Sequence, residues 1–522
     1  MPRDAAPTNR RQHTVPVNQR HRSRILLVAS LCSLIAAGST QAADCPQWGQ
    51  HHSRNMVSTE TGLPSSLDPD TGENVKWVVP LGTQTYATPI VAGGKVFIGT
   101  NNENPRDPRH QGDRGILLCL NESDGSLCWQ LIAPKLVDDR YKDWPEAGMC
   151  SPPTVEGDRV YMVTNRNEVV CLDLHGLANG NDGPYQDEAR RAVPPGTEPV
   201  GLTEADADII WLYDFPSEIN IFPHDGAHCS PLIHGRFMYI NTNSGHTTDH
   251  QGIRNPQAPS LVVFDKTTGR LIAQDDEGIG PKIFHSTWSS PALGEVNGRT
   301  LIFFCGGDGV VYAFEPLTSV PPPGTVVNLK RVWRYDCDPN APKDNIHDYF
   351  RNREVSPSNI KSLPVFHNNR VYVTAGGDIW WGKRKAWLKC IDAAGTGDIT
   401  DDGTLWSYPI PGHCCSTPSI SDGLAFVADC DRNVHCVDAK TGEPYWTHQC
   451  DGDMWASTLV ADGKVYIGTR RRGFWIFAAD RQKEVLCSVK LDSPIVGSPV
   501  AANGVVYVAT MKKLYALEKT TH

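Results

Sequence analysis

A short pattern that recurs along the chain constrains the fold more than any other feature of the sequence. Most copies open with a small residue, a Ser or Thr and a Pro, followed by an apolar strand, a turn and a second apolar strand. The last three copies start 40 and 41 residues apart, and loops lengthen the earlier ones. The eight starts are Ala87-Thr88-Pro89, Cys150-Ser151-Pro152, Cys229-Ser230-Pro231, Ser289-Ser290-Pro291, Ser362-Leu363-Pro364, Ser416-Thr417-Pro418, Ala456-Ser457-Thr458 and Gly497-Ser498-Pro499.

Repeats of this length are typical of propeller blades, each of which is a four-stranded sheet. The strands are rich in β-branched and aromatic residues and end at Gly, Asp or Asn turns, while helical patterns are nearly absent. A blade buries its faces only against its neighbours, so eight stacked blades share one core. The sequence therefore predicts an all-β fold, an eight-bladed β-propeller of four-stranded antiparallel blades.

The two ends of the repeat array predict how the ring closes. The last copy stops at residues 514–518 without an outer strand, and a strand-like segment at about 74–80 has no blade of its own. Pairing these two segments would close the ring and remove both free sheet edges. We therefore expect residues 43–522 to form a single propeller domain closed by this N-terminal strand.

The N-terminal 42 residues predict export. Arginines precede an apolar run at residues 25–37, and small residues continue to Thr40-Gln41-Ala42, an arrangement typical of a secretory signal peptide. The run is too short to span a bilayer as a mature helix, and an uncleaved anchor is the alternative. We expect the general secretion route, a periplasmic or extracellular location and no membrane span.

The net charge of −10 argues against a nucleic-acid partner. Removing residues 1–42 takes away six arginines and one aspartate, which makes the rest of the chain more acidic. We expect the exported chain to act as a monomer.

Three segments carry a family resemblance: Val-Tyr-Ile-Gly-Thr at 465–469, Leu-Tyr-Ala-Leu at 514–517 and Thr-Gly-Glu-Pro-Tyr-Trp at 441–446. They resemble the repeat of pyrroloquinoline-quinone (PQQ)-like propellers, from about residue 44 to residue 522. That family includes quinone-dependent alcohol and sugar dehydrogenases and the non-catalytic assembly propeller of the bacterial outer-membrane machinery. The segments at 397–400 and 288–291 are most similar to secreted bacterial members of uncharacterised role. The resemblance implies the propeller fold, whereas fold alone does not fix function.

The residue before each small residue of the repeat start is expected to line the mouth of the axial channel. Together with His224, His285 and His413, these residues form the best pocket candidate in the sequence. They are Tyr86, Met149, His228, Trp288, Lys361, Cys415, Trp455 and Val496.

The family resemblance also implies a cofactor site. In the dehydrogenases an adjacent cysteine pair lies against one face of PQQ and a tryptophan against the other, which here selects Cys414 and Cys415 with Trp288 or Trp455. Asn243 resembles the amide ligand of the calcium ion.

Three departures weaken this assignment. The cysteine pair opens the sixth copy rather than an early one. Ser289 stands where the resemblance implies a catalytic aspartate, and a hydroxyl cannot accept a proton near neutral pH. Glu168 is only a loose match to the glutamate ligand.

A transition-metal site is a second possibility. His224, His228 and Cys229 are spaced at i, i+4 and i+5, and His285 comes from the adjacent copy. Imidazole and thiolate suit zinc or copper. A crowded channel mouth without a metal accounts for the same residues.

The sequence favours a binding or scaffolding module of the cell envelope, with a protein or glycan partner, over an enzyme. The alternatives are a PQQ- and calcium-dependent dehydrogenase of alcohols or sugars, and a glycan-binding propeller. Inserted loops at 101–115 and 174–208, and the Trp380-Trp381 pair with basic residues after it, are candidate recognition surfaces.

Overall fold

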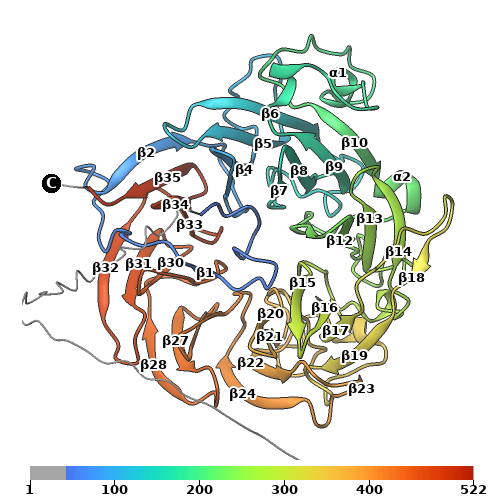
Figure 1. Cartoon of the computed structure of the whole chain (residues 1–522). Helices are drawn as coiled ribbons and strands as arrows, with labels where there is room; N and C mark the ends of the chain where they lie inside the picture. The colour runs from blue at the N-terminus through green and yellow to red at the C-terminus, as the bar shows by residue number, and fades with distance from the viewer. Residues whose placement is uncertain (1–42, 521–522) are drawn as a thin grey trace, which may run out of the picture. The chain divides into compact units, whose positions relative to one another are not determined.

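The computed structural model describes residues 43–520, which belong to one compact unit. The predicted signal peptide lies outside the described residues. Eight blades of four antiparallel strands form a ring, so the predicted fold is confirmed (Figure 1). Within residues 43–520, no helix is both long and apolar enough to cross a membrane.

The first four blades run from residue 90 to residue 336. Blade 1 contains β3 (Ile90–Ala92), β4 (Lys95–Asn101), β5 (Arg114–Asn121) and β6 (Leu127–Pro134). Blade 2 contains β7 (Thr154–Glu156), β8 (Arg159–Val163), β9 (Glu168–Asp173) and β10 (Ile209–Asp214). Blade 3 contains β11 (Leu232–His234), β12 (Phe237–Asn241), β13 (Leu261–Asp265) and β14 (Arg270–Gln274). Blade 4 contains β15 (Ala292–Val296), β16 (Arg299–Cys305), β17 (Val310–Phe314) and β19 (Arg331–Asp336).

The other four blades complete the ring. Blade 5 contains β20 (Val365–His367), β21 (Arg370–Gly376), β22 (Lys385–Asp392) and β24 (Thr404–Pro411). Blade 6 contains β25 (Ser419–Ser421), β26 (Leu424–Ala428), β27 (Asn433–Asp438) and β28 (Pro444–Gln449). Blade 7 contains β29 (Leu459–Ala461), β30 (Lys464–Gly468), β31 (Gly473–Ala478) and β32 (Val485–Lys490). Blade 8 contains β33 (Val500–Ala502), β34 (Val505–Ala509), β35 (Lys513–Glu518) and β2 (Val75–Pro80).

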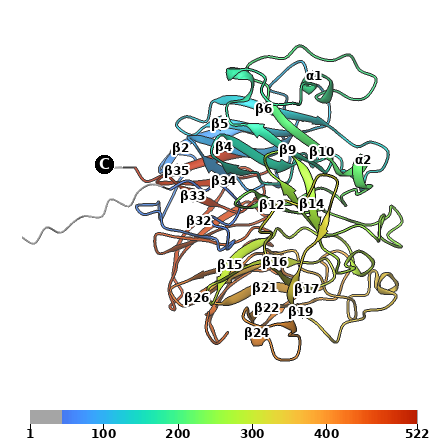
Figure 2. The same ribbon diagram turned by 45° about the vertical axis from the view of Figure 1, so that its right-hand side comes forward.

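Short elements decorate this ring. β1 (Val57–Ser58), β18 (Val327–Asn328) and β23 (Gly397–Asp398) each add a parallel strand to a blade. The helices α1 (Glu188–Arg191) and α2 (Phe215–Ile219) lie on the outside of the ring in both views (Figure 1, Figure 2). Three 3-10 turns lie at Gly176–Asn179, Gly280–Lys282 and Ile346–Tyr349.

The ring closes as the sequence predicts. β2 pairs antiparallel with β35, so that Val79 lies opposite Leu514 and Val75 opposite Leu517. The outer strand of blade 8 therefore comes from the N-terminal side of the chain, and both terminal strands are paired.

Tryptophans connect neighbouring blades. Six outer strands carry a Trp whose indole N–H donates to a backbone carbonyl just after the third strand of the next blade. The indole rings can approach closely because the next blade often places a glycine against the Trp side chain. A Cβ at Gly442, which has φ of 77°, would lie 2.6 Å from the Trp406 ring. The six are Trp77, Trp129, Trp211, Trp333, Trp406 and Trp446.

Residues 45–58, which we call the N-terminal plug, cross the centre of the ring (Figure 1). The sequence did not indicate this role, because the plug contains no repeat. The plug hydrogen-bonds to every blade at or beside its inner strand. Cys45 bonds to blade 1, Pro46 to blade 2, Gln50 to blade 8 and His52 to blade 4. Ser53 bonds to blade 5, Arg54 to blades 3 and 4, Asn55 to blade 6 and Met56 to blade 7.

Arg54 is the central polar group of the plug and is completely buried. Its guanidinium donates to the Pro291 carbonyl at 2.8 Å, the Ser230 carbonyl at 2.9 Å and the Trp48 carbonyl at 2.7 Å. Burial lowers the pKa of Arg54 to about 10, so the side chain remains charged near neutral pH. One cation thus satisfies carbonyls of the plug and of blades 3 and 4.

We expect Arg54→Met to destabilise the protein by about 3 kcal/mol, because several buried carbonyls lose their donor. The matched control is Arg334→Met, whose exposed ion pair with Asp398 contributes at most about 1 kcal/mol. Denaturant unfolding of the two variants measures the difference. Equal losses would show that the plug does not hold the blades together.

Candidate functional site

A cavity of about 410 Å³ lies on the axis, and all eight blades contribute residues that precede their inner strands. Seven of the eight residues expected at the channel mouth line it: Tyr86, His228, Trp288, Lys361, Cys415, Trp455 and Val496. Met149 does not, because it packs between blades 1 and 2. There Gly99 and Gly115 leave room for its side chain.

The wall of the cavity is strongly aromatic. Trp48 from the plug, Tyr141, Trp144 and Trp381 join the aromatic residues already named. The Trp380-Trp381 pair, expected as a surface patch, lies in this wall. The ring of Trp380 meets the rings of Trp288 and Trp455 edge-on, at centroid distances of 5.4 and 5.5 Å.

A buried ion pair supports one side of the cavity. Lys361 Nζ lies 3.0 Å from a carboxylate oxygen of Asp378 and 3.9 Å from the centre of the Trp288 ring. Although burial opposes ionisation, Lys361 and His285 hold the pKa of Asp378 well below its usual value. The carboxylate therefore stays charged and keeps both partners in place.

Three histidines from different loops meet in the cavity wall. His224 precedes blade 3, His250 lies between β12 and β13, and His285 precedes blade 4. One ring nitrogen from each lies within 4.8 Å of the other two. The His224 ring centroid is 4.9 Å from that of His250 and 4.8 Å from that of His285. These three residues are what the structure offers as a metal-binding group in the cavity.

Only two of the four residues considered as metal ligands from the sequence lie together in the structure. His224 and His285 come together, whereas His228 packs against Trp288 with ring centroids 4.6 Å apart. Cys229 lies in the core between blades 2 and 3, where its Sγ accepts the Asn241 N–H at 3.3 Å. Successive side chains of an extended segment point to opposite sides, so His228 and Cys229 face different environments.

His250 was absent from the sequence-based set because it belongs to an inserted loop outside the repeat. A signal was present in His246-Thr-Thr-Asp-His250, where two histidines are separated by three residues. His246 packs beside the three, with its ring centroid 5.5 Å from that of His224.

Burial keeps the inner imidazoles neutral. Desolvation, reinforced by the neighbouring histidines, lowers the pKa of His224 well below its usual value. Desolvation also lowers the pKa of His246 to about 2 and of His228 to about 3. A neutral imidazole has a free lone pair, which is the form that binds metals.

The PQQ candidates are only partly brought together. Trp288, Trp455 and Cys415 line the cavity, whereas Cys414 and Asn243 do not. Cys414 Sγ donates to the Ala428 carbonyl at 3.1 Å in the core between blades 5 and 6. In the described part of the chain, every cysteine from Cys45 to Cys487 is a free thiol.

The residues that the resemblance matches to the calcium ligands and to the catalytic aspartate lie outside the cavity lining. The Asn243 amide oxygen accepts the His228 N–H at 3.1 Å. Glu168 forms ion pairs with Arg166 and Arg191, and Ser289 is buried outside the cavity lining. This donor set does not fit the calcium–quinone arrangement that the family resemblance implies.

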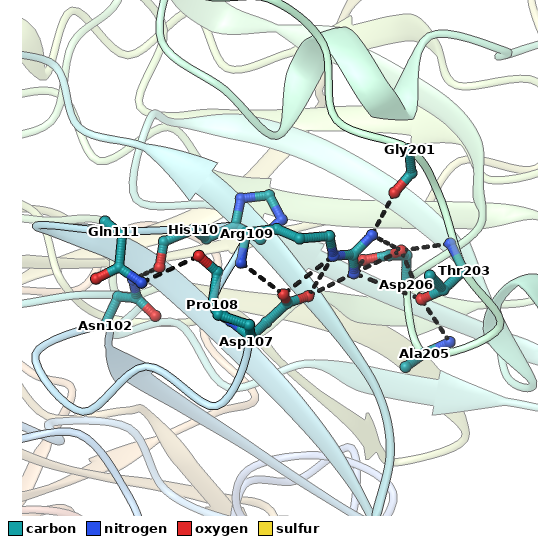
Figure 3. A network of polar contacts seen from close by, with 10 residues as sticks. All are labelled: Asn102, Asp107, Pro108, Arg109, His110, Gln111, Gly201, Thr203, Ala205 and Asp206. Carbon is teal, nitrogen blue, oxygen red and sulfur yellow. Dashed lines mark hydrogen bonds and ion pairs between the residues drawn. The ribbon is translucent and has the colours of Figure 1, made fainter.

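A cluster of two aspartates and a histidine lies where two inserted loops meet. Asp107 and Asp206 lie with His110 in a cluster of metal-ligating type, but Arg109 lies between the carboxylates (Figure 3). Its guanidinium donates to Asp107 at 2.8 Å and to Asp206 at 2.9 Å. The hydrogen bond to Asp107 raises the pKa of Arg109. Burial opposes this shift, and the hydrogen bond to Asp206 adds to it. The guanidinium therefore supplies the cation here and connects the two loops.

Comparisons with known proteins agree with this architecture. A family model described as outer membrane protein assembly factor BamB matches residues 384–484. No curated protein sequence matches the chain.

Solved structures match over most of the chain. BamB from Moraxella catarrhalis is 12% identical, with a TM-score of 0.51 over 85% of this chain and 97% of that chain. A quinohemoprotein alcohol dehydrogenase from Pseudomonas putida is 13% identical, with a TM-score of 0.57 over 92% of this chain and 81% of that chain. A second such enzyme, from Comamonas testosteroni, is 12% identical with a TM-score of 0.56 over the same shares.

Likeness at this level of identity shows a shared fold. Together with the eight repeats, it shows that the chain shares the β-propeller fold of BamB and the quinohemoprotein alcohol dehydrogenases, and that residues 384–484 are similar to the BamB family model.

Proposed function

We propose that this chain is an exported binding module of the cell envelope whose axial cavity captures a planar, anionic ligand. The observation that carries the proposal is the aromatic wall of the cavity. Its volume of about 410 Å³ lies in the range of small-molecule sites. Indole and phenol faces bind planar groups by stacking and edge contacts.

Positive charge beside the aromatic wall supports an anionic ligand. The guanidinium of Arg470 lies 4.1 Å from the centre of the Trp455 ring, and that of Arg140 lies 4.2 Å from Trp144. Arg351 lies 5.3 Å from the Trp381 ring. All three arginines are exposed. Arg470 already pairs with Asp453. Since guanidinium groups pair well with carboxylates, Arg140 and Arg351 favour a ligand with a negatively charged edge.

The wider role rests on the sequence. The signal-like N-terminus supports export, and the fold shared with BamB is compatible with a non-catalytic envelope role. The sequence also favours scaffolding with a protein or glycan partner. A concave aromatic cavity supports ligand capture more directly than it supports a broad protein interface. Dehydrogenation of alcohols or sugars has less support, because Asn243 and Glu168 are engaged elsewhere.

PQQ is itself a planar aromatic anion and serves as the probe, with anilinonaphthalene sulfonate as a second probe. We expect PQQ to quench tryptophan fluorescence saturably in calcium-free buffer. Trp380→Ala should weaken binding about tenfold, since an aromatic contact contributes about 1.4 kcal/mol. Trp387→Ala is the matched control, because Trp387 lies on β22 beside Lys385 and outside the cavity.

The same preparation tests the alternative. Dye-linked alcohol oxidation that requires added calcium and PQQ would replace the proposal with a dehydrogenase. Failure of both probes to bind, or equal losses in the two tryptophan variants, would also overturn it.

A further inference from the structure

We propose that His224, His250 and His285 bind one divalent transition-metal ion, zinc or copper, in the wall of the axial cavity. This inference goes beyond ligand capture and does not depend on the planar anion. It extends the pairing of His224 with His285 that the sequence suggested, by adding His250 and removing His228 and Cys229.

The three histidines converge on one point of the cavity wall. Three loops that are far apart in sequence bring one ring nitrogen each to within 4.8 Å of the others. Tetrahedral ligands at about 2.1 Å from zinc lie roughly 3.4 Å apart, so the rings need to close by up to about 1.4 Å. His250 is only partly buried and lies on a loop, so it can supply that movement. Gly245 lets His224 approach, because a Cβ at Gly245 would lie 2.2 Å from the His224 Cβ.

His224 lacks hydrogen-bond partners for its imidazole ring among residues 43–520. Its side chain is fully buried, and neither ring nitrogen has a hydrogen-bond partner. The nearest acid is Asp225, whose carboxylate oxygen is 3.9 Å from His224 Nε2, too far for a hydrogen bond. A buried polar group without a partner costs about 1–3 kcal/mol. A metal ion in the cavity would satisfy one of these nitrogens.

The His285 ring is oriented by hydrogen bonds at both of its nitrogens. Its Nδ1 lies 3.0 Å from Asp378, and its Nε2 accepts the indole N–H of Trp381 at 3.2 Å. Since an indole only donates, Nε2 carries the lone pair and Nδ1 carries the proton given to Asp378. A carboxylate behind a histidine is the usual support of a metal-binding imidazole. Lys361 and Asn359 hold that carboxylate in turn.

The donor set selects the class of metal. Neutral imidazoles suit zinc and copper, whereas calcium and magnesium take oxygen ligands. Three protein ligands leave a coordination position for water or a ligand, as in open metal sites. All three histidines line the cavity, so that position is accessible from it.

The test uses protein first stripped with a chelator and then titrated with Zn²⁺ by calorimetry. We expect one ion per chain and a rise in melting temperature. Titration with Cu²⁺ should give an electron paramagnetic resonance spectrum with coupling to imidazole nitrogens. Binding with no single stoichiometry and no nitrogen coupling would mean that the histidines hold no metal.

Two variants change the affinity in opposite directions. His250→Asn should weaken Zn²⁺ binding at least tenfold, and Asn tolerates the left-handed φ of 58° at this position. His367→Asn, on β20 and outside the cavity, is the matched control. Trp381→Phe keeps an aromatic ring but frees His285 Nε2, so it should strengthen binding.

Unchanged affinity in His250→Asn, or weaker binding in Trp381→Phe, would overturn the site. If His250→Asn does not fold, Trp381→Phe and the Cu²⁺ spectrum of the unmodified protein still decide the question. Binding of anilinonaphthalene sulfonate to the metal-free protein reports on the proposed ligand capture separately.

Discussion

The N-terminal plug determines how the centre of this propeller is organised. Inner strands converge at the axis, where backbone N–H and C=O groups beside them would otherwise face an empty channel. The plug satisfies such groups in every blade, and buried Arg54 binds carbonyls from blades 3 and 4. It also contributes Trp48 to the cavity wall. The same segment therefore joins the blades and bounds the site, which couples the stability of the ring to the shape of the cavity.

The tryptophans distribute a second set of contacts around the ring. Each of the six packs on the next blade and also donates a hydrogen bond, so each interface combines apolar burial with a directional contact. The outer strands of blades 3 and 7 lack this residue, and Cys487 lies at the equivalent pairing position of β32. These two interfaces lack the indole contact and combine core packing with other hydrogen bonds, such as those from the Asn241 amide to the Thr287 carbonyl and from the Ser457 N–H to Ser498.

The repeat predicted the number of blades, the closing strand and seven of the residues that line the cavity. It could not predict features that occur once. The plug has no repeat, His250 comes from an insertion, and Met149 moved into the core because glycines of β4 and β5 left space for it. Cys414 and Cys415 are adjacent in sequence, yet Cys414 faces the core and Cys415 the cavity. Side-chain direction within an irregular segment depends on tertiary packing, which a sequence pattern does not report.

The cavity contains groups that a stable core would avoid. A lysine–aspartate pair is buried beside Trp288, and His224 is buried without hydrogen bonds. Such groups reduce stability and are retained where a site uses them. A ring held by the plug and by six tryptophans can tolerate that cost. Because any ligand that binds only the folded state adds to its stability, occupation of the cavity would offset part of the cost. The buried ion pair and the unpaired histidine therefore belong to the proposed binding site.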